Sequence, residues 1–147
     1  LHLTGPSAGG AGFHVCESKT SFDDSSGRSI TMAARLKTND YAMGPEFASV
    51  TNAALGTYRV YVYKDDIDQA KAQLQLSGAT VTAWSRAGEM KTWTLAVPAF
   101  AQAGVNLWNV VDVSFGADLA APTYTTLDEV KSVGNATDST SPAYCVP

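Results

Sequence analysis

The sequence predicts an all-β protein, a two-layer antiparallel β-sandwich of jelly-roll or immunoglobulin-like type with about eight strands. Three observations predict this fold. Apolar and polar residues alternate in several short segments, most clearly in 56–64, where Tyr58, Val60 and Val62 share one face. Turn residues separate these segments about every 8 to 12 residues. The strand–helix–strand alternation of a parallel sheet is absent from the sequence pattern.

The length and composition are those of one extracellular domain. A chain of 147 residues fits a single domain over 1–147, with a flexible Gly-rich segment at 1–12 and an extended Ser/Thr-rich segment at 117–147. Only 16% of the residues are charged and the net charge is −4. Clustered Lys and Arg are absent, so we expect no nucleic-acid partner.

No part of the sequence predicts a membrane span. An apolar run of about 20 residues, which a membrane-spanning helix needs, does not occur. A signal peptide and a lipid-anchor motif are not visible either, so a secreted form is expected to have lost its leader.

The first half of the chain contains four expected strands. They are 13–16, 28–37, 46–51 and 56–64. Residues 18–27 are polar and rich in turn formers, and are expected to form a loop. The segment 56–64 is the strongest strand, with Arg59, Tyr61 and Tyr63 on the face opposite to Tyr58.

The second half contains three more expected strands. They are 80–85, 92–97 and 105–115, and a helical turn is possible near 69–73. In 105–115, strict alternation places Leu107 and Val111 on one face and Trp108 and Val110 on the other. Apolar residues on both faces predict a central strand or a strand covered by a second layer.

Two cysteines, one near each end, predict a disulfide. Cys16 and Cys145 are the two cysteines of a chain of low charge. An even number of cysteines in such a chain favours an oxidising compartment and a secreted protein. The alternative is two unpaired, buried thiols. Asn135 begins an Asn-Ala-Thr sequon, so it is the predicted glycosylation site if the protein comes from a eukaryote.

The sequence predicts no catalytic residue, metal site or cofactor. It lacks a Gly-x-Ser-x-Gly elbow, and its two histidines are His2, at a flexible end, and His14, in a strand. Chelation of copper by an N-terminal histidine and a second histidine, as in some polysaccharide oxygenases, is blocked by Leu1 unless processing removes that residue. Asp65, Asp66 and Asp68 could hold calcium, but a solvated acidic turn is the simpler interpretation.

Aromatic side chains opposite the main apolar faces are the remaining candidate for binding. Trp84, Tyr61 and Tyr63 could stack on sugar rings if they form an exposed row, as in a carbohydrate-binding module. The alternative, which we favour, is that a second layer or the long C-terminal segment covers them.

The middle of the chain, roughly 12–115, resembles the YfaP-like family of secreted bacterial β-sandwich domains. The order of the following blocks carries the resemblance: His14-Val15, Asp40-Tyr-Ala-Met-Gly-Pro-Glu46, Gly56-Thr-Tyr-Arg-Val-Tyr-Val62, Ser77-Gly-Ala-Thr-Val81, Lys91-Thr-Trp93 and Trp108-Asn-Val110. Where the family has an Asp-rich run before its His-Val pair, this chain has Ala11-Gly12-Phe13. We therefore do not infer for this chain any metal-binding or ligand-binding role of that acidic run. The resemblance implies an extracellular sandwich and no particular activity.

These observations favour a non-enzymatic, secreted structural or adhesive domain, such as a subunit of an extracellular fibre or surface assembly. Its expected partners are other copies of itself, or a cell-surface protein or glycan. The alternatives are a carbohydrate-binding module and, after that, a polysaccharide-active enzyme.

Overall fold

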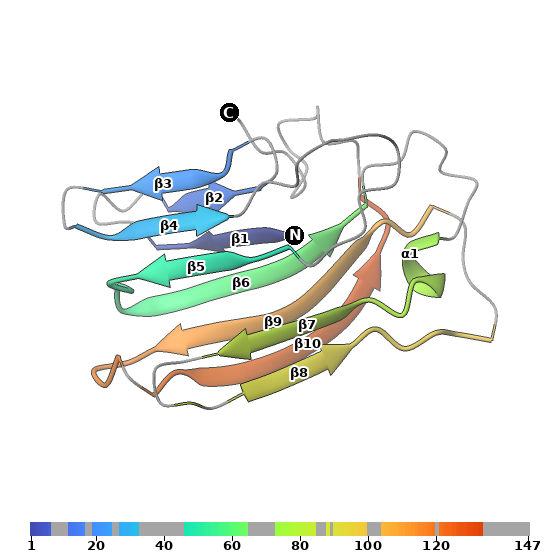
Figure 1. Ribbon diagram of the computed structural model, residues 1–147. Coiled ribbons are helices and arrows are strands. Elements are labelled where there is room, and N and C mark those ends of the chain that lie inside the picture. The colour runs from blue at the N-terminus through green and yellow to red at the C-terminus, as the bar shows by residue number, and fades with distance from the viewer. Residues whose placement is uncertain are drawn as a thin grey trace.

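The all-β prediction is confirmed by a computed structural model of the chain (Figure 1). The structure describes residues 1–6, 12–16, 19–24, 27–32, 46–64, 73–84, 88, 90–99, 104–119 and 121–133. This part of the chain holds ten strands and one short helix, α1 (Gln73–Leu76). Every strand pair in it is antiparallel. Within the described residues, no helix has the length and apolar character needed to cross a bilayer.

Five strands form the main sheet, in the order β10-β9-β6-β1-β2. Their bounds are β1 (His2–Gly5), β2 (Phe13–Val15), β6 (Gly56–Tyr63), β9 (Leu107–Phe115) and β10 (Thr123–Lys131). The strongest strand predicted from the sequence, β6, is the middle strand of this sheet. It pairs with β9 over its whole length, so its alternation sets the two faces of the sheet.

Two smaller sheets complete the fold. One has the order β3-β4-β5 and the other is the hairpin β7-β8. Their bounds are β3 (Ser21–Asp23), β4 (Ser29–Met32), β5 (Ala48–Thr51), β7 (Thr80–Trp84) and β8 (Met90–Thr94). Figure 1 shows β7 and β8 lying across β9 and β10, while β3, β4 and β5 lie toward β1 and β2. The jelly-roll or immunoglobulin-like subtype stays a prediction.

Both small sheets pack on the same face of the main sheet, which we call the inner face. One core cluster joins Ile30 of β4 to Tyr58 of β6 and to three residues of β1 and β2. These three are Leu3, Phe13 and Val15. The opposite, outer face carries Arg59, Tyr61 and the other residues that alternate with the core positions.

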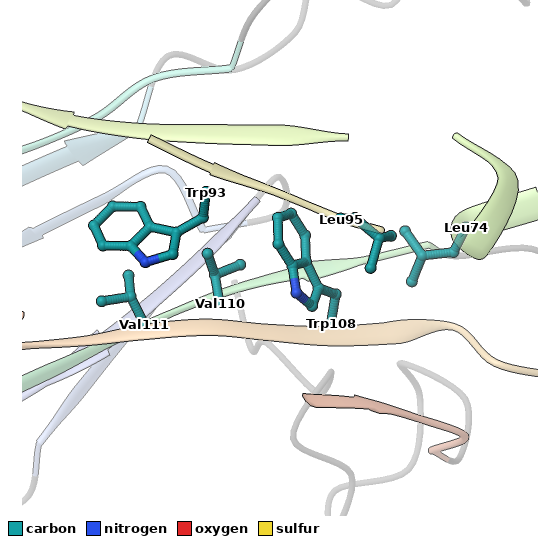
Figure 2. Close-up of a cluster of buried hydrophobic side chains, with 6 residues drawn as sticks. All are labelled: Leu74, Trp93, Leu95, Trp108, Val110 and Val111. Atoms are coloured by element: carbon teal, nitrogen blue, oxygen red, sulfur yellow. The ribbon is translucent and has the colours of Figure 1, made fainter. Parts of the chain in front are cut away.

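A second core cluster lies under the β7-β8 hairpin (Figure 2). Its buried members are Leu74, Trp93, Leu95, Trp108, Val110 and Val111. Figure 2 shows the Trp93 and Trp108 rings side by side between the hairpin and β9. Each indole donates a hydrogen bond to β10: Trp93 Nε1 to Thr126 Oγ1 (2.9 Å) and Trp108 Nε1 to Asp128 Oδ1 (3.0 Å). Both indole N–H groups are therefore hydrogen-bonded although the rings are buried.

A β-bulge in β9 corrects the predicted faces of this strand. Val60 lies opposite Val111, but Tyr61 lies opposite Asn109, so Val110 is the extra residue. The bulge reverses the alternation, which places Trp108 on the inner face with Val111 and moves Leu107 to the outer face. The sequence prediction that Leu107 shares a face with Val111 is therefore wrong.

Three other predictions of local structure are wrong. The segment 1–12, expected to be flexible, contains β1, which pairs with both β2 and β6. Residues 18–27, expected to be a loop, contain β3. The segment 117–147, expected to be extended but without a strand pattern, contains the nine-residue strand β10. In each case pairing with a neighbouring strand stabilises a segment whose own apolar pattern is weak.

Candidate functional site

Three neighbouring strands bring two histidines and two tyrosines together on the outer face of the main sheet. His2 of β1 lies opposite Tyr61 of β6, and His14 of β2 lies opposite Thr4, two residues along β1 from His2. Leu3 lies between His2 and Thr4 and points to the core. Alternation along β1 and β2 therefore places both imidazoles on the outer face. We call His2, His14, Tyr61 and Tyr63 the His–Tyr cluster.

Polar atoms of His2 and Tyr61 are both within hydrogen-bond distance of His14 Nε2. His2 Nδ1 lies 2.9 Å from His14 Nε2, and the Tyr61 hydroxyl lies 2.8 Å from the same His14 nitrogen. The His2 ring stacks on the Tyr61 ring, with centroids 4.9 Å apart and an interplanar angle of 21°. The Tyr63 ring meets the His2 ring edge-on at 5.8 Å. These ring contacts fix the orientation of His2.

Burial keeps His2 and Tyr61 uncharged at neutral pH. The His2 side chain is 8% exposed, and burial lowers its pKa to about 3, with smaller effects from the positive charges of the Leu1 amino group and His14. The Tyr61 side chain is 3% exposed, and burial raises the pKa of its hydroxyl. At neutral pH the cluster therefore offers a neutral imidazole of His2 and a protonated phenol. The neutral imidazole can accept a hydrogen bond or coordinate a metal, whereas the protonated phenol is suited to hydrogen bonding, and neither group is an ionised nucleophile.

Charged groups lie beside the cluster on the same face. The Arg59 guanidinium donates two hydrogen bonds of 2.7 Å to the two oxygens of Asp112, from Nε to Oδ1 and from a terminal nitrogen to Oδ2. Asn109 Nδ2 donates to Glu129 Oε2 (2.9 Å), which also pairs with Lys131. The pairing of Arg59 with Asp112 is bidentate, which fixes both side chains across β6 and β9.

A shallow hollow of about 490 Å³ adjoins the cluster at the β1-β2 hairpin. Thr4, Gly5, Gly12, Phe13, His14, Lys19 and Phe22 line it. His14 thus belongs both to the cluster and to a concave surface that contains a lysine and two aromatic rings.

The three aromatic residues considered as possible sugar-stacking residues do not form one exposed row. Trp84 is 64% exposed, but it lies at the end of β7 in the hairpin. Tyr61 is buried beside His2, and Tyr63 is half-buried on the outer face of the main sheet. The exposed-row hypothesis is therefore wrong for Tyr61, and of these three only Trp84 offers an exposed ring.

Several other predicted residues fall wholly or partly outside the described part of the chain. Cys16 is buried at the end of β2 and does not carry a free thiol, but Cys145 lies outside the described residues. The Cys16–Cys145 pairing stays a prediction. Asn135 and the acidic residues Asp65, Asp66 and Asp68 also lie outside the described residues.

The proximity of His2 and His14 was not predicted from the sequence. His2 was expected at a flexible end, whereas it is the first residue of strand β1 and pairs with Tyr61 of β6. A signal was present: His2 precedes Leu3, and His14 lies between Phe13 and Val15, so each imidazole alternates with core residues. No group of three or more His, Cys, Asp or Glu side chains able to hold a metal occurs among the described residues.

Neither the family models, nor the curated proteins, nor the solved structures contain a match to this chain. The resemblance to the YfaP-like family therefore stays a prediction.

Proposed function

We propose that this chain is a non-enzymatic, secreted structural or adhesive domain that associates with further copies of itself through strand β10. The observation that carries the proposal is the position of β10 at an edge of the main sheet, where it pairs with β9 on one side. Among the described residues, its other side has no hydrogen-bonded strand. An edge strand of nine residues is a template on which a strand of another molecule can pair.

The first half of β10 is the better template. Thr123, Tyr124, Thr125 and Thr126 carry no charge and pair with β9 in continuous register. A bulge follows, at which Asp128 adopts a φ of 46°, and Glu129 and Lys131 add charges. Bulges and charges disfavour edge pairing, so the second half of β10 limits how far a partner strand could extend.

An extracellular location agrees with the low share of charged residues and with a Cys16 that is not a free thiol. The proposal of a non-enzymatic role rests on the sequence, which lacks the nucleophile elbow of a hydrolase. The YfaP-like resemblance adds a precedent for a secreted sandwich domain without a known activity.

The test compares lysine substitutions on an edge strand and on a central strand. Thr123, Thr125 and Thr57 are exposed threonines on the outer face, but Thr57 lies in β6, which is paired on both sides. We expect the wild type to assemble with rising concentration in light scattering and negative-stain images. The double variant Thr123→Lys/Thr125→Lys should weaken association by about tenfold or more, whereas Thr57→Lys should assemble like the wild type. A wild type that stays monomeric at millimolar concentration, or equal assembly of all three proteins, would refute the proposal.

Carbohydrate binding at Trp84 is the second candidate, because this indole is 64% exposed on a β-strand. An exposed indole offers a flat apolar surface on which a sugar ring can stack. A glycan array with the wild type and Trp84→Ala tests it, and Leu55→Ala, another exposed apolar residue, is the matched control. Binding that Trp84→Ala abolishes and Leu55→Ala retains would support this function; binding that both variants retain would exclude it.

A further inference from the structure

In the His–Tyr cluster, two possible metal-binding atoms lie within hydrogen-bond distance of a third. His2 Nδ1 and the Tyr61 hydroxyl lie 2.9 Å and 2.8 Å from a single atom, His14 Nε2. The three side chains come from three hydrogen-bonded strands, and the backbone register fixes their spacing. The donor atoms are therefore positioned by the sheet itself.

We propose that His2 Nδ1, His14 Nε2 and the Tyr61 oxygen form a binding site for one divalent transition-metal ion, with Cu(II) preferred. The site is distinct from β10, on which the proposed function rests, so either proposal can fail without the other.

The separation of the two imidazole nitrogens fits neighbouring positions around such an ion. Imidazole nitrogens bind metals at about 2.0 Å, and two donors at this distance and at a right angle to each other are about 2.9 Å apart. The observed 2.9 Å between His2 Nδ1 and His14 Nε2 matches this value. Right-angled nitrogen and oxygen donors are characteristic of the tetragonal sites of Cu(II) and Ni(II).

The donor types also select the class of metal. Two imidazoles and a phenol oxygen suit copper, nickel and zinc, whereas magnesium and calcium prefer carboxylates and carbonyls. For a given nitrogen and oxygen site, Cu(II) binds most tightly among the divalent first-row ions. Binding replaces the hydrogen bonds that His14 Nε2 makes with His2 and Tyr61. Each histidine then carries its proton on its other ring nitrogen, and Tyr61 keeps its proton and coordinates as a weak, neutral phenol.

The surroundings agree with such a site. The stacked Tyr61 ring and the edge of Tyr63 hold the His2 imidazole in place. The hollow beside His14 gives one side of the site access to solvent, so water can complete the coordination.

The experiment uses the chain without an affinity tag and with residues before Leu1, so that no terminal amine competes for copper. CuCl₂ and ZnCl₂ are titrated separately by calorimetry, and the Cu(II) complex is examined by electron paramagnetic resonance. We expect one Cu(II) per chain, hyperfine coupling from two imidazole nitrogens and weaker binding of Zn(II). His2→Gln and His14→Gln should each weaken Cu(II) binding by more than about tenfold, and Tyr61→Phe, which keeps the ring, should weaken it less.

Asp112→Asn is the matched control, because it removes a nearby carboxylate from the same face and leaves the imidazoles in place. It should bind Cu(II) like the wild type.

Circular dichroism without metal checks that each variant is folded. If the histidine variants unfold, Cu(II)-induced broadening of the wild-type NMR signals decides the matter: broadening centred on β1 and β2 supports the site, and broadening elsewhere refutes it. Equal affinity of the wild type and a folded His2→Gln/His14→Gln variant would show that the two histidines form a hydrogen bond only.

Discussion

The hydroxyl of Tyr58 illustrates how a single polar atom fixes a turn in this protein. The ring is buried in the core, while the hydroxyl accepts a hydrogen bond from the Ala54 N–H (2.7 Å) and donates one to the Ala54 carbonyl (3.2 Å). The core ring is thereby tied to the segment that connects β5 to β6.

We predict that Tyr58→Phe lowers the free energy of unfolding by about 1–3 kcal/mol, because it leaves the Ala54 backbone groups without this partner. Urea denaturation at pH 8 measures the change. Thr57→Val is the control, since it removes an exposed hydroxyl that pairs with Ser114, and it should cost less than about 0.5 kcal/mol. An equal loss in both variants would contradict the prediction.

The same hydroxyl gives a prediction for alkaline pH. Burial is the main cause that raises the pKa of Tyr58 above its ordinary value of 10.0. As the pH rises above 10, the unfolded chain loses this proton before the folded chain does, so the folded state loses stability. We expect the stability difference between wild type and Tyr58→Phe to shrink between pH 8 and pH 11. A constant difference in urea denaturation over this range would contradict it.

Gly5 is required by close packing. A Cβ atom at this position would lie 2.6 Å from Tyr58 Cδ1 and 2.7 Å from Phe13 Cε1, two aromatic rings of the core. We predict that Gly5→Ala destabilises the protein by about 1–3 kcal/mol, which thermal unfolding would detect. Gly116→Ala, where no atom lies within 4 Å of the added carbon, is the control and should have little effect.

At the scale of the elements, the junction of β9 and β10 depends on Asp128. This residue adopts a φ of 46° in the bulge and accepts the hydrogen bond of the buried Trp108 indole. Asparagine also tolerates this backbone conformation and keeps a carbonyl oxygen in place of the acceptor, whereas alanine lacks both properties.

We therefore predict that Asp128→Ala lowers the free energy of unfolding by about 1–3 kcal/mol, and that Asp128→Asn changes it by less than about 1 kcal/mol. Urea unfolding followed by tryptophan fluorescence measures both variants. An asparagine variant as unstable as the alanine variant would show that the carboxylate charge, and not the backbone or the acceptor, is what matters.

The bulges also explain which elements could be predicted from the sequence. The strand β6 alternates regularly and was predicted correctly, whereas β9 and β10 change their alternation at the bulges beside Val110 and Asp128. In β10 the less exposed apolar side chains are Tyr124, Leu127 and Val130, a spacing of three that resembles no ideal strand. A bulge is defined by how two strands pair, so the residue pattern of one strand alone does not reveal it.

The His–Tyr cluster was beyond prediction for a related reason. The alternation of His2 with Leu3, and of His14 with Phe13 and Val15, could have placed each imidazole on a polar face. The local sequence does not determine which strands are neighbours. The strand β1 lies between β2 and β6, and its pairing with β6 joins residues 54 positions or more apart. Trp84 was correctly placed on a strand, but its separation from Tyr61 is a property of the topology.

At the scale of the whole molecule, the Cys16–Cys145 disulfide is the prediction with the largest effect on stability. Cys16 is buried and is not a free thiol. Closing a loop of about 130 residues should contribute about 2–5 kcal/mol, so reduction or Cys16→Ala should lower the unfolding temperature. Thiol titration of the denatured, unreduced protein measures the pairing directly, and two reactive thiols per chain would contradict it.

The two core clusters have a consequence for how the molecule opens. They lie under different small sheets, and the partly buried residues that pack against both of them are Val60 and Val113, on the adjacent strands β6 and β9. The two clusters are thus connected through these two valines and the backbone hydrogen bonds around them. We therefore expect amide protons under the β7-β8 hairpin to exchange with deuterium through openings that leave the β3-β4-β5 half closed, which hydrogen exchange would show as two groups of rates within one continuous sheet.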